Sequence, residues 1–403
     1  MEDKIELIKS SIRNRFGLSE WSGAVGDLGT LLPLIFALVI YNEYPVSRIL
    51  LLAGIVYILT GWIFKVPVSV QPLKAMAVIA LAHGFSIDFL STTAFFYGFL
   101  LILLSITGII TWLQNWISVA IIRGIQLGIG LILAQKAIEL VLDKGFLMFN
   151  PNNGLIVNLC IFLIVFSVIL YFQHKTNIPI ALIMIALSIP VILFFYKIPT
   201  DFVSDSNLFN INVPDTSFLL NGLIYLIIPQ LPLTLGNAIF AASESCHSLW
   251  GNQAKRVSPS RLGLSIGISD LFIGLFGGFP VCHGAGGIAA HAQFGGKTGG
   301  TTIIIGMILV ITAILKPLTG ILFLIPVPIL GAMLLFDSWR MIMLFRKSTY
   351  KIEIGIALIV GIISFLTRNL ALALVIGILL ERGIKIYDRS QKRKMVEVKG
   401  SEE

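Results

Sequence analysis

Long apolar runs recur along this chain from about Trp21 to about Glu381, and no long polar stretch separates them. A run of about 20 apolar residues crosses the hydrocarbon core of a bilayer as one helix. Of the 403 residues, 56% are hydrophobic and 12% are charged, which is too little polar material to cover a water-soluble globule. The sequence therefore predicts an all-α polytopic membrane protein in a lipid bilayer, with no room for a soluble domain.

The apolar windows divide into about fourteen expected spans, seven in each half of the chain. The first seven are expected near 22–41, 46–64, from 72, 92–112, 116–134, 155–172 and 178–196. The second seven are expected near 218–247, 260–276, from 284, 301–316, 320–338, 352–367 and 369–384. Because seven is odd, the second copy enters the membrane upside down, which predicts a 7+7 inverted repeat.

The distribution of charge predicts which parts face the cytoplasm, because cytoplasmic loops are rich in Lys and Arg. The predicted external link carries Asp201, Asp205 and Asp215, whereas the other predicted loops and the C-terminal tail hold most of the basic residues. Both termini are therefore expected in the cytoplasm of a cell-membrane protein. The expected regions are a cytoplasmic interfacial amphipathic helix at 1–18, a first transmembrane repeat at 19–197, an external link at 198–216, a second transmembrane repeat at 217–386 and a cytoplasmic basic tail at 387–403.

Two of the expected spans are short and interrupted, and each stands third in its own half. Pro67–Ser69 precedes the third span and Pro280–Cys282 precedes the tenth, an offset of 213 residues (280 − 67). Interrupted spans at matching places in two halves are the best sequence pointer to a transporter's binding site. We expect both spans to form half-helices, the first of them starting at Pro72.

The starts of these half-helices are expected to hold an anion. Free N–H groups and the positive end of the helix dipole favour negative charge at a helix N-terminus. In the first copy Gln71 would stand at the cap, and Leu73 and Lys74 would offer free N–H groups. In the second copy the glycines of 277–287 would let a ligand approach the backbone closely. Two facing starts predict one anion cradle; the alternative is that these glycines and prolines only kink or pack helices.

Ionisable residues inside spans are costly and therefore candidates for function. Lys74 either attracts an anion or pairs with Asp27 or Glu244. Asp27 and Glu244 are coupling or gating candidates that exchange a proton, or else they complete structural ion pairs. Arg123 and Asp270 are candidates for structural charge partners, since neither lies in an interrupted span.

Several classes of function are not expected. The histidines lack neighbours at ligand spacing that would close a metal site, so no metal is expected. No nucleotide-binding or nucleophile motif is complete, so neither catalysis nor a cofactor is expected. The formal net charge of +8 lies largely in the chain ends and loops, which is typical of membrane topology. Nucleic acid is therefore not an expected partner.

At these segments the chain resembles the molybdate transporter family that is distantly related to the sulfate permeases. The matching stretches are Gly26–Thr30 with Pro33, Pro67–Ala75, Arg123–Gly128, Gln230–Thr234 with Asn237, and Phe279–Gly287. The resemblance implies molybdate uptake by a core domain that moves against a gate domain, without the soluble C-terminal regulatory domain usual in sulfate permeases. It also implies substrate contact near Gln71, Lys74, His283 and Gly284.

These observations lead to one leading hypothesis and several alternatives. The leading one is a secondary transporter that imports a tetrahedral oxyanion, molybdate first, by alternating access, with a co-transported proton and a homodimer left open. The substrate-binding candidates are Gln71, Pro72, Leu73, Lys74, Asn237, His283, Gly284, Ala285 and Gly286. The alternatives are a sulfate, tungstate or nucleobase permease on the same fold, an uncoupled anion channel, and a membrane receptor or scaffold. Cationic Lys74 beside two helix starts favours a dianion over a neutral base.

Overall fold

The computed structural model describes residues 13–113, 118–148, 154–172, 179–197, 208–209, 211–347 and 350–400. These residues form helices throughout, apart from two short strands and the connecting segments. The first half contains α2 (Leu18–Gly26), α3 (Leu28–Asn42), α4 (Val46–Phe64), β1 (Gln71–Pro72), α5 (Lys74–His83), α6 (Ile87–Ile106), α7 (Ile109–Leu113), α8 (Val119–Asp143), α9 (Leu155–Phe172) and α10 (Ile180–Phe195).

The second half begins with the 3₁₀ turn η2 (Thr216–Phe218). A long segment follows in which α-helical and π-helical turns alternate, namely α11 (Leu219–Gly222), η3 (Leu223–Ile227), α12 (Ile228–Leu233), η4 (Thr234–Phe240) and α13 (Ala241–Trp250). It continues with η5 (Gly251–Arg256), α14 (Pro259–Leu275), β2 (Val281–Cys282), α15 (Ala285–Gln293), α16 (Gly300–Ile314), α17 (Lys316–Leu322), α18 (Val327–Met343), η6 (Leu344–Lys347), α19 (Lys351–Thr367) and α20 (Leu370–Gly400).

A helix lies at every place where the sequence predicted a span, although several bounds differ. The helix expected at 92–112 is α6, which starts at Ile87 because the Ser86 side chain accepts the N–H of Phe89 at 3.3 Å. By length and apolar composition, six helices of the described chain are able to cross a membrane, or up to eight if the bent pairs α2–α3 and α16–α17 each count once. A multi-pass helical fold is therefore confirmed, whereas the fourteen spans stay a prediction.

The structure describes part of each predicted terminal region. Of the interfacial helix predicted at 1–18, residues 1–12 lie outside the described residues, 13–17 are not helical and α2 begins at Leu18. The basic tail predicted from 387 continues α20, a single helix that runs to Gly400.

The span predicted at 320–338 is divided, because α17 ends at Leu322 and α18 begins after Pro326.

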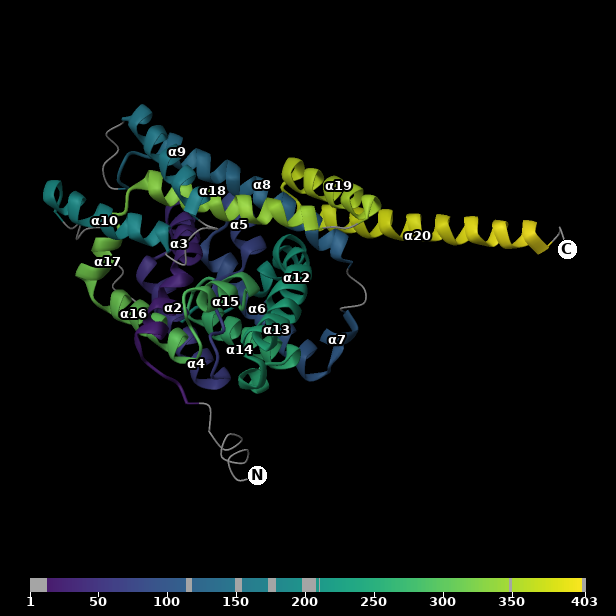
Figure 1. Ribbon diagram of the computed structural model, residues 1–403, viewed down its shortest axis with the longest axis horizontal. Helices are drawn as coiled ribbons and strands as arrows, with labels where there is room; N and C mark the ends of the chain where they lie inside the picture. Colours follow the sequence, from purple (N-terminus) through teal and green to yellow (C-terminus); the bar gives the residue numbers. More distant parts are fainter. Residues whose placement is uncertain are drawn as a thin grey trace, which may run out of the picture.

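Two groups of helices lie side by side (Figure 1). One group contains α8, α9, α18, α19 and α20, with α8 packed along both α18 and α19. The other contains α4, α6, α13, α14, α15 and α16, in which α4 packs along α16 and α6 along α14. Glycines bring these backbones together: a Cβ added at Gly54 would lie 2.8 Å from the carbonyl oxygen of Gly306.

The two interrupted spans cross each other between α3, which contacts β1, and α14, which contacts β2. β1 and β2 pair in antiparallel fashion, with Gln71 opposite Cys282 and Pro72 opposite Val281. Prolines and β-branched residues favour extended backbone here, and helices start on the far side of each strand. The first half-helix begins at Lys74 rather than at Pro72, because Pro72 belongs to β1. This crossing brings the N-termini of α5 and α15 close together.

Candidate anion-binding site

A cavity of about 740 Å³ lies between the two groups of helices, at the starts of α5 and α15. The predicted site residues that line it are Gln71, Lys74, Arg123, Asn237, Glu244, Ala285 and Gly286. Polar and charged lining residues that the sequence analysis did not single out are Thr30, Gln126, Asp337 and Arg340. The walls come from α3, β1, α5, η4, α13 and α15 on one side and from α8, α18 and η6 on the other.

The start of α15 presents unoccupied backbone donors to this cavity. The N–H groups of Gly287 and Ile288 donate to the carbonyl oxygen of Gly284 at 3.1 and 3.2 Å. Among the described residues, the N–H groups of Ala285 and Gly286 have no such partner. Both residues line the cavity at the positive end of a nine-residue helix. This end of α15 therefore has the chemistry of an anion-binding helix N-terminus.

The start of α5 is more occupied than the sequence predicted. The N–H of Leu73 donates to the carbonyl oxygen of Pro280 at 3.0 Å, so the expectation of a free N–H at Leu73 was wrong. The next two donors, at Ala75 and Met76, both donate to Oε1 of Gln230 at 3.0 and 3.2 Å. What α5 offers the cavity is chiefly the half-buried side chain of Lys74.

The cavity lining carries more positive than negative side chains. Lys74 faces it from α5, Arg123 from α8 and Arg340 from α18, whereas the carboxylates are those of Glu244 and Asp337. Among the described residues, Lys74 makes no salt bridge with Glu244 within 4.0 Å. An excess of cations with fixed amide donors favours an anionic ligand.

Arg123 lines the cavity, whereas the sequence analysis offered it as a structural charge partner. Its Nη1 donates to Oε1 of Gln126 at 3.0 Å. Its buried Nε–H has no partner within the described part of the chain, so the guanidinium keeps a donor for a ligand. Arg340 was missed because the predicted span ended at 338 and left it in a loop, although α18 runs to Met343. Asp337 lay inside that predicted span, so the cost of a charge in a membrane was an available signal.

Four of the predicted substrate-binding residues lie outside the cavity lining and shape the crossing instead. Pro72 and Leu73 are buried in and beside β1. His283 is fully buried, with Nδ1 2.9 Å from the carbonyl oxygen of Ser69 and Nε2 2.9 Å from Oγ of Ser265. The carbonyl oxygen of Gly284 accepts a hydrogen bond from Oγ of Ser69 at 2.7 Å. Direct contact of these residues with a substrate stays a prediction.

The two buried carboxylates predicted from the sequence have different surroundings. Asp270 accepts the N–H of Val281 at 2.7 Å and so holds β2 against α14. Asp27 stands at the junction of α2 and α3, where it accepts hydrogen bonds from the side chains of Tyr57, Gln71 and Thr30. Asp27 therefore orients two side chains, Gln71 and Thr30, that themselves line the cavity.

Comparison with known proteins finds relatives that cover most of this chain. A family model described as "Molybdate transporter of MFS superfamily" matches residues 19–133 and 222–341, more than half of the chain. Molybdate transporter 1 of Arabidopsis thaliana is 28% identical over 412 residues, which covers 93% of this chain and 89% of that protein. The guanine/hypoxanthine permease GhxP of Escherichia coli O157:H7 is 23% identical over 396 residues, covering 88% of this chain and 85% of that protein.

A solved structure shows the same fold. The murine Solute Carrier 26 family member A9 anion transporter, in the inward-facing state, matches with a TM-score of 0.65 at 14% identity, covering 95% of this chain and 70% of that chain. Apolar helices, two crossing half-helices and a polar cavity between two helix groups define a multi-pass membrane transporter. Within that class, the chain belongs to the molybdate transporter family. The resemblance that the sequence motifs indicated is confirmed.

Proposed function

We propose that this protein is a secondary transporter that imports a tetrahedral oxyanion, molybdate first, by alternating access. The main support is that the free N–H groups of Ala285 and Gly286 line the same cavity as the side chain of Lys74. Arg123 and Arg340 face the same space from the opposite helix group. All five groups are hydrogen-bond donors, which suits a ligand made only of acceptors.

The composition of this cavity favours a dianion over a nucleobase. A tetrahedral oxyanion presents four acceptor oxygens, whereas a purine presents donors and acceptors along the edge of a flat ring. A purine needs acceptors as well as donors. The cavity offers two carboxylates, Glu244 and Asp337, but three cationic side chains and two backbone donors outnumber them, which favours a dianion. Tungstate and sulfate share the shape and charge of molybdate. Competition experiments, rather than the geometry of the cavity, therefore decide which of the three anions is preferred.

Packing between the halves supports the 7+7 inverted repeat as part of this proposal. In the proposed repeat, α4 and α14 are the second spans of their halves, and α6 and α16 are the fourth. α4 packs along α16 and α14 packs along α6, so each second span contacts the fourth span of the other half. Gly54 and Gly267 make close contacts in these two pairs, and they are 213 residues apart, as are Pro67 and Pro280.

The two-sided construction of the cavity supports alternating access. The start of α15 belongs to one helix group, while Arg123 and Arg340 belong to the other. A rigid shift of one group against the other would change which end of the cavity is open while the anion stays at the half-helix starts.

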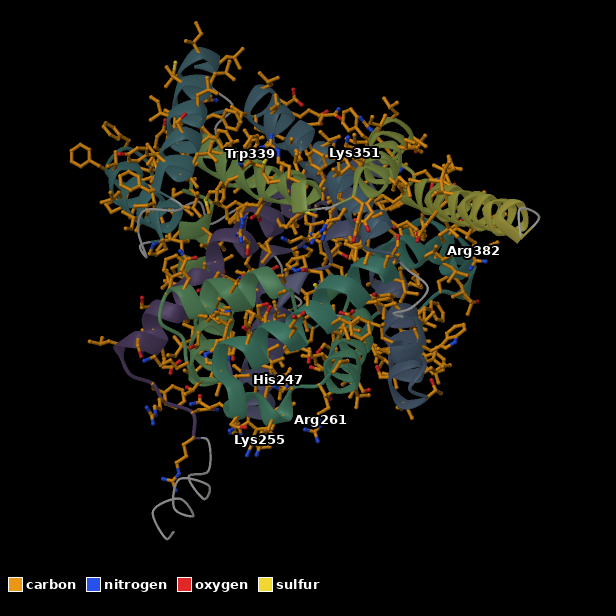
Figure 2. All side chains as sticks on the ribbon, turned by 45° about the vertical axis from the view of Figure 1, so that its right-hand side comes forward. His247, Lys255, Arg261, Trp339, Lys351 and Arg382 are labelled. Carbon is orange, nitrogen blue, oxygen red and sulfur yellow. The ribbon has the colours of Figure 1, made fainter. Side chains whose placement is uncertain are left out.

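The orientation of the protein is proposed from its basic surface. Lys255 and Arg261 lie at one end of the molecule, beside His247, where α13 turns into α14 (Figure 2). By the positive-inside rule we propose that this end faces the cytoplasm.

Uptake of labelled molybdate into proteoliposomes tests the proposed function. We expect saturable uptake that excess tungstate blocks and that excess uracil leaves unchanged. Competition by excess sulfate measures how well the third oxyanion is accepted. Uptake that uracil abolishes would contradict the substrate class, and a non-saturating current carried by molybdate would favour the channel.

A further inference from the structure

Behind the cavity wall, an acidic and a basic side chain face each other in full burial. Asp27, between α2 and α3, and His291, on α15, are each 0% exposed. Oδ2 of Asp27 lies 3.7 Å from Nε2 of His291. Glycine permits this approach, because a Cβ added at Gly287 on α15 would lie 2.6 Å from Oδ1 of Asp27. The mechanism outlined above gives this pair no task.

The surroundings of His291 determine where its proton lies. Nδ1 is 2.9 Å from the carbonyl oxygen of Gly23, which only accepts hydrogen bonds, so Nδ1 carries a hydrogen. In the neutral ring Nε2 is then an acceptor. It has no hydrogen-bond partner in the described part of the chain, and the atom it faces is another acceptor, Oδ2 of Asp27. Two acceptors therefore face each other, and a proton on Nε2 would turn one of them into a donor.

The surroundings of Asp27 also favour one added proton on His291. Oδ1 accepts from the side chains of Thr30 and Gln71, and Oδ2 accepts from the hydroxyl of Tyr57. Three donors suit the ionised carboxylate, but all three are neutral, so its charge stays uncompensated unless His291 is cationic. A buried charge without a counter-charge is costly, and one added proton removes that cost.

We propose that Asp27 and His291 form a proton-binding site that is coupled to the anion site through Gln71. The proposal rests on the proposed function and adds the coupling ion. One proton binds to Nε2 of His291 in the state that binds the anion, and it leaves from Nε2 after the anion is released. No bond other than this N–H forms or breaks.

Gln71 connects the two sites because it touches both. Its Nε2 donates to Asp27 and lies 2.7 Å from Oγ1 of Thr30, and both Gln71 and Thr30 line the cavity. While Asp27 lacks a counter-charge it holds these donors strongly and adds negative charge behind the anion site. Protonation of His291 neutralises the pair, which releases the hold on Gln71 and removes a repulsion from a dianion.

Other titratable or charged groups surround the pair from the elements packed against it. The Tyr57 ring on α4 lies edge-on to His291, with ring centroids 6.4 Å apart. Cys282 on β2 and Asp337 on α18 are close enough to interact electrostatically with Asp27. Further groups on packed elements are Glu20 on α2, Tyr41 on α3, Arg48 on α4, Lys74 and His83 on α5, Glu244 and His247 on α13 and Arg340 on α18. Of all these, His291 alone has an unpartnered ring nitrogen facing Asp27.

Molybdate accumulation in proteoliposomes under an inward proton gradient tests the site. The membrane potential is clamped with potassium and valinomycin, and the gradient is one pH unit. One coupled proton raises the steady-state accumulation about tenfold per pH unit. We expect that factor for the wild type, together with molybdate-driven proton entry seen by an internal pH dye. We expect both readouts to vanish in His291→Gln while exchange of labelled for unlabelled molybdate continues.

Two further variants make the outcome decisive. Asp27→Asn keeps the side-chain shape and removes the charge, so it should lose the gradient effect as well, including in the event that His291→Gln does not fold. His247→Gln changes a histidine on the exposed end of α13 and should keep the tenfold response. The proposal is overturned if the wild type exchanges molybdate but ignores the gradient, or if both site variants keep the full response. Absence of molybdate exchange in the wild type would instead contradict the proposed function.

Discussion

Replacing Gly287 by Ala places one methyl group where the proposed anion and proton sites meet. The added Cβ would lie 2.6 Å from Oδ1 of Asp27, 2.6 Å from Cβ of Ser69 and 2.7 Å from Nε2 of Gln71. Ordinary contact begins at 3.4 Å, so these atoms have to retreat by about 0.8 Å (3.4 − 2.6). The side chain of Gln71 is the one of the three that moves most freely, and it would turn away from its place in the cavity wall.

The size of the effect follows from the cost of overpacking. An extra methyl group in a close-packed interior costs about 1–3 kcal/mol. When Gln71 relieves this strain by turning, anion binding has to restore the strained arrangement, and the cost appears as lost affinity. Because 1.4 kcal/mol corresponds to a factor of ten, molybdate affinity should fall by about fivefold to one hundredfold in Gly287→Ala.

The assay is molybdate titration of the purified variant, followed by tryptophan fluorescence or calorimetry in detergent. Gly355→Ala on α19 is the matched control, because a Cβ there would meet no atom within 4 Å. It should keep wild-type affinity and stability, as expected of an added methyl on an open helix face. Wild-type affinity in a correctly folded Gly287→Ala protein would refute the idea that Gln71 and Asp27 support the anion site.

Further substitutions test separate parts of the site. Lys74→Ala and Gln71→Ala should each raise the molybdate KM about tenfold or more, since charge-assisted hydrogen bonds contribute about 1.5–3 kcal/mol, while Arg346→Ala on the exposed η6 should not. Initial uptake rates measure this, and equal KM values in all three variants would remove the site assignment. Asp270→Ala leaves the Val281 N–H without its acceptor and should lower the free energy of unfolding by about 1–3 kcal/mol. Thermal unfolding in detergent measures that loss, and an unchanged midpoint would show that β2 does not depend on Asp270.

The crossing of the half-helices could be predicted because its causes are local. Pro67, Pro72 and Pro280 forbid continuous helix where they stand, and the glycines after Cys282 permit tight backbone approach. These signals located the half-helix starts, where Gln71, Lys74, Ala285 and Gly286 line the cavity. The exact start of α5 was two residues wrong, because strand pairing with β2 captured Pro72. Pairing between segments more than 200 residues apart has no local sequence signal.

Other parts of the site depend on contacts over long sequence distances. Gln230, 155 residues from Ala75 in the sequence, accepts hydrogen bonds from backbone N–H groups at the start of α5. The two half-helix starts therefore differ, although the sequence repeat suggested equal roles. Arg340 reached the cavity because α18 begins and ends later than the hydropathy window indicated. His291 was considered as a metal ligand and set aside; its proximity to Asp27 depends on the packing of α15 against α2.

The most direct test of the central claim is an experimental structure of the protein with tungstate. Tungstate has the shape and charge of molybdate, and its heavy atom gives unmistakable density. We expect one tungstate in the cavity, within hydrogen-bond distance of the N–H groups of Ala285 and Gly286 and of Nζ of Lys74. Tungstate bound elsewhere, with these three groups unoccupied, would contradict it.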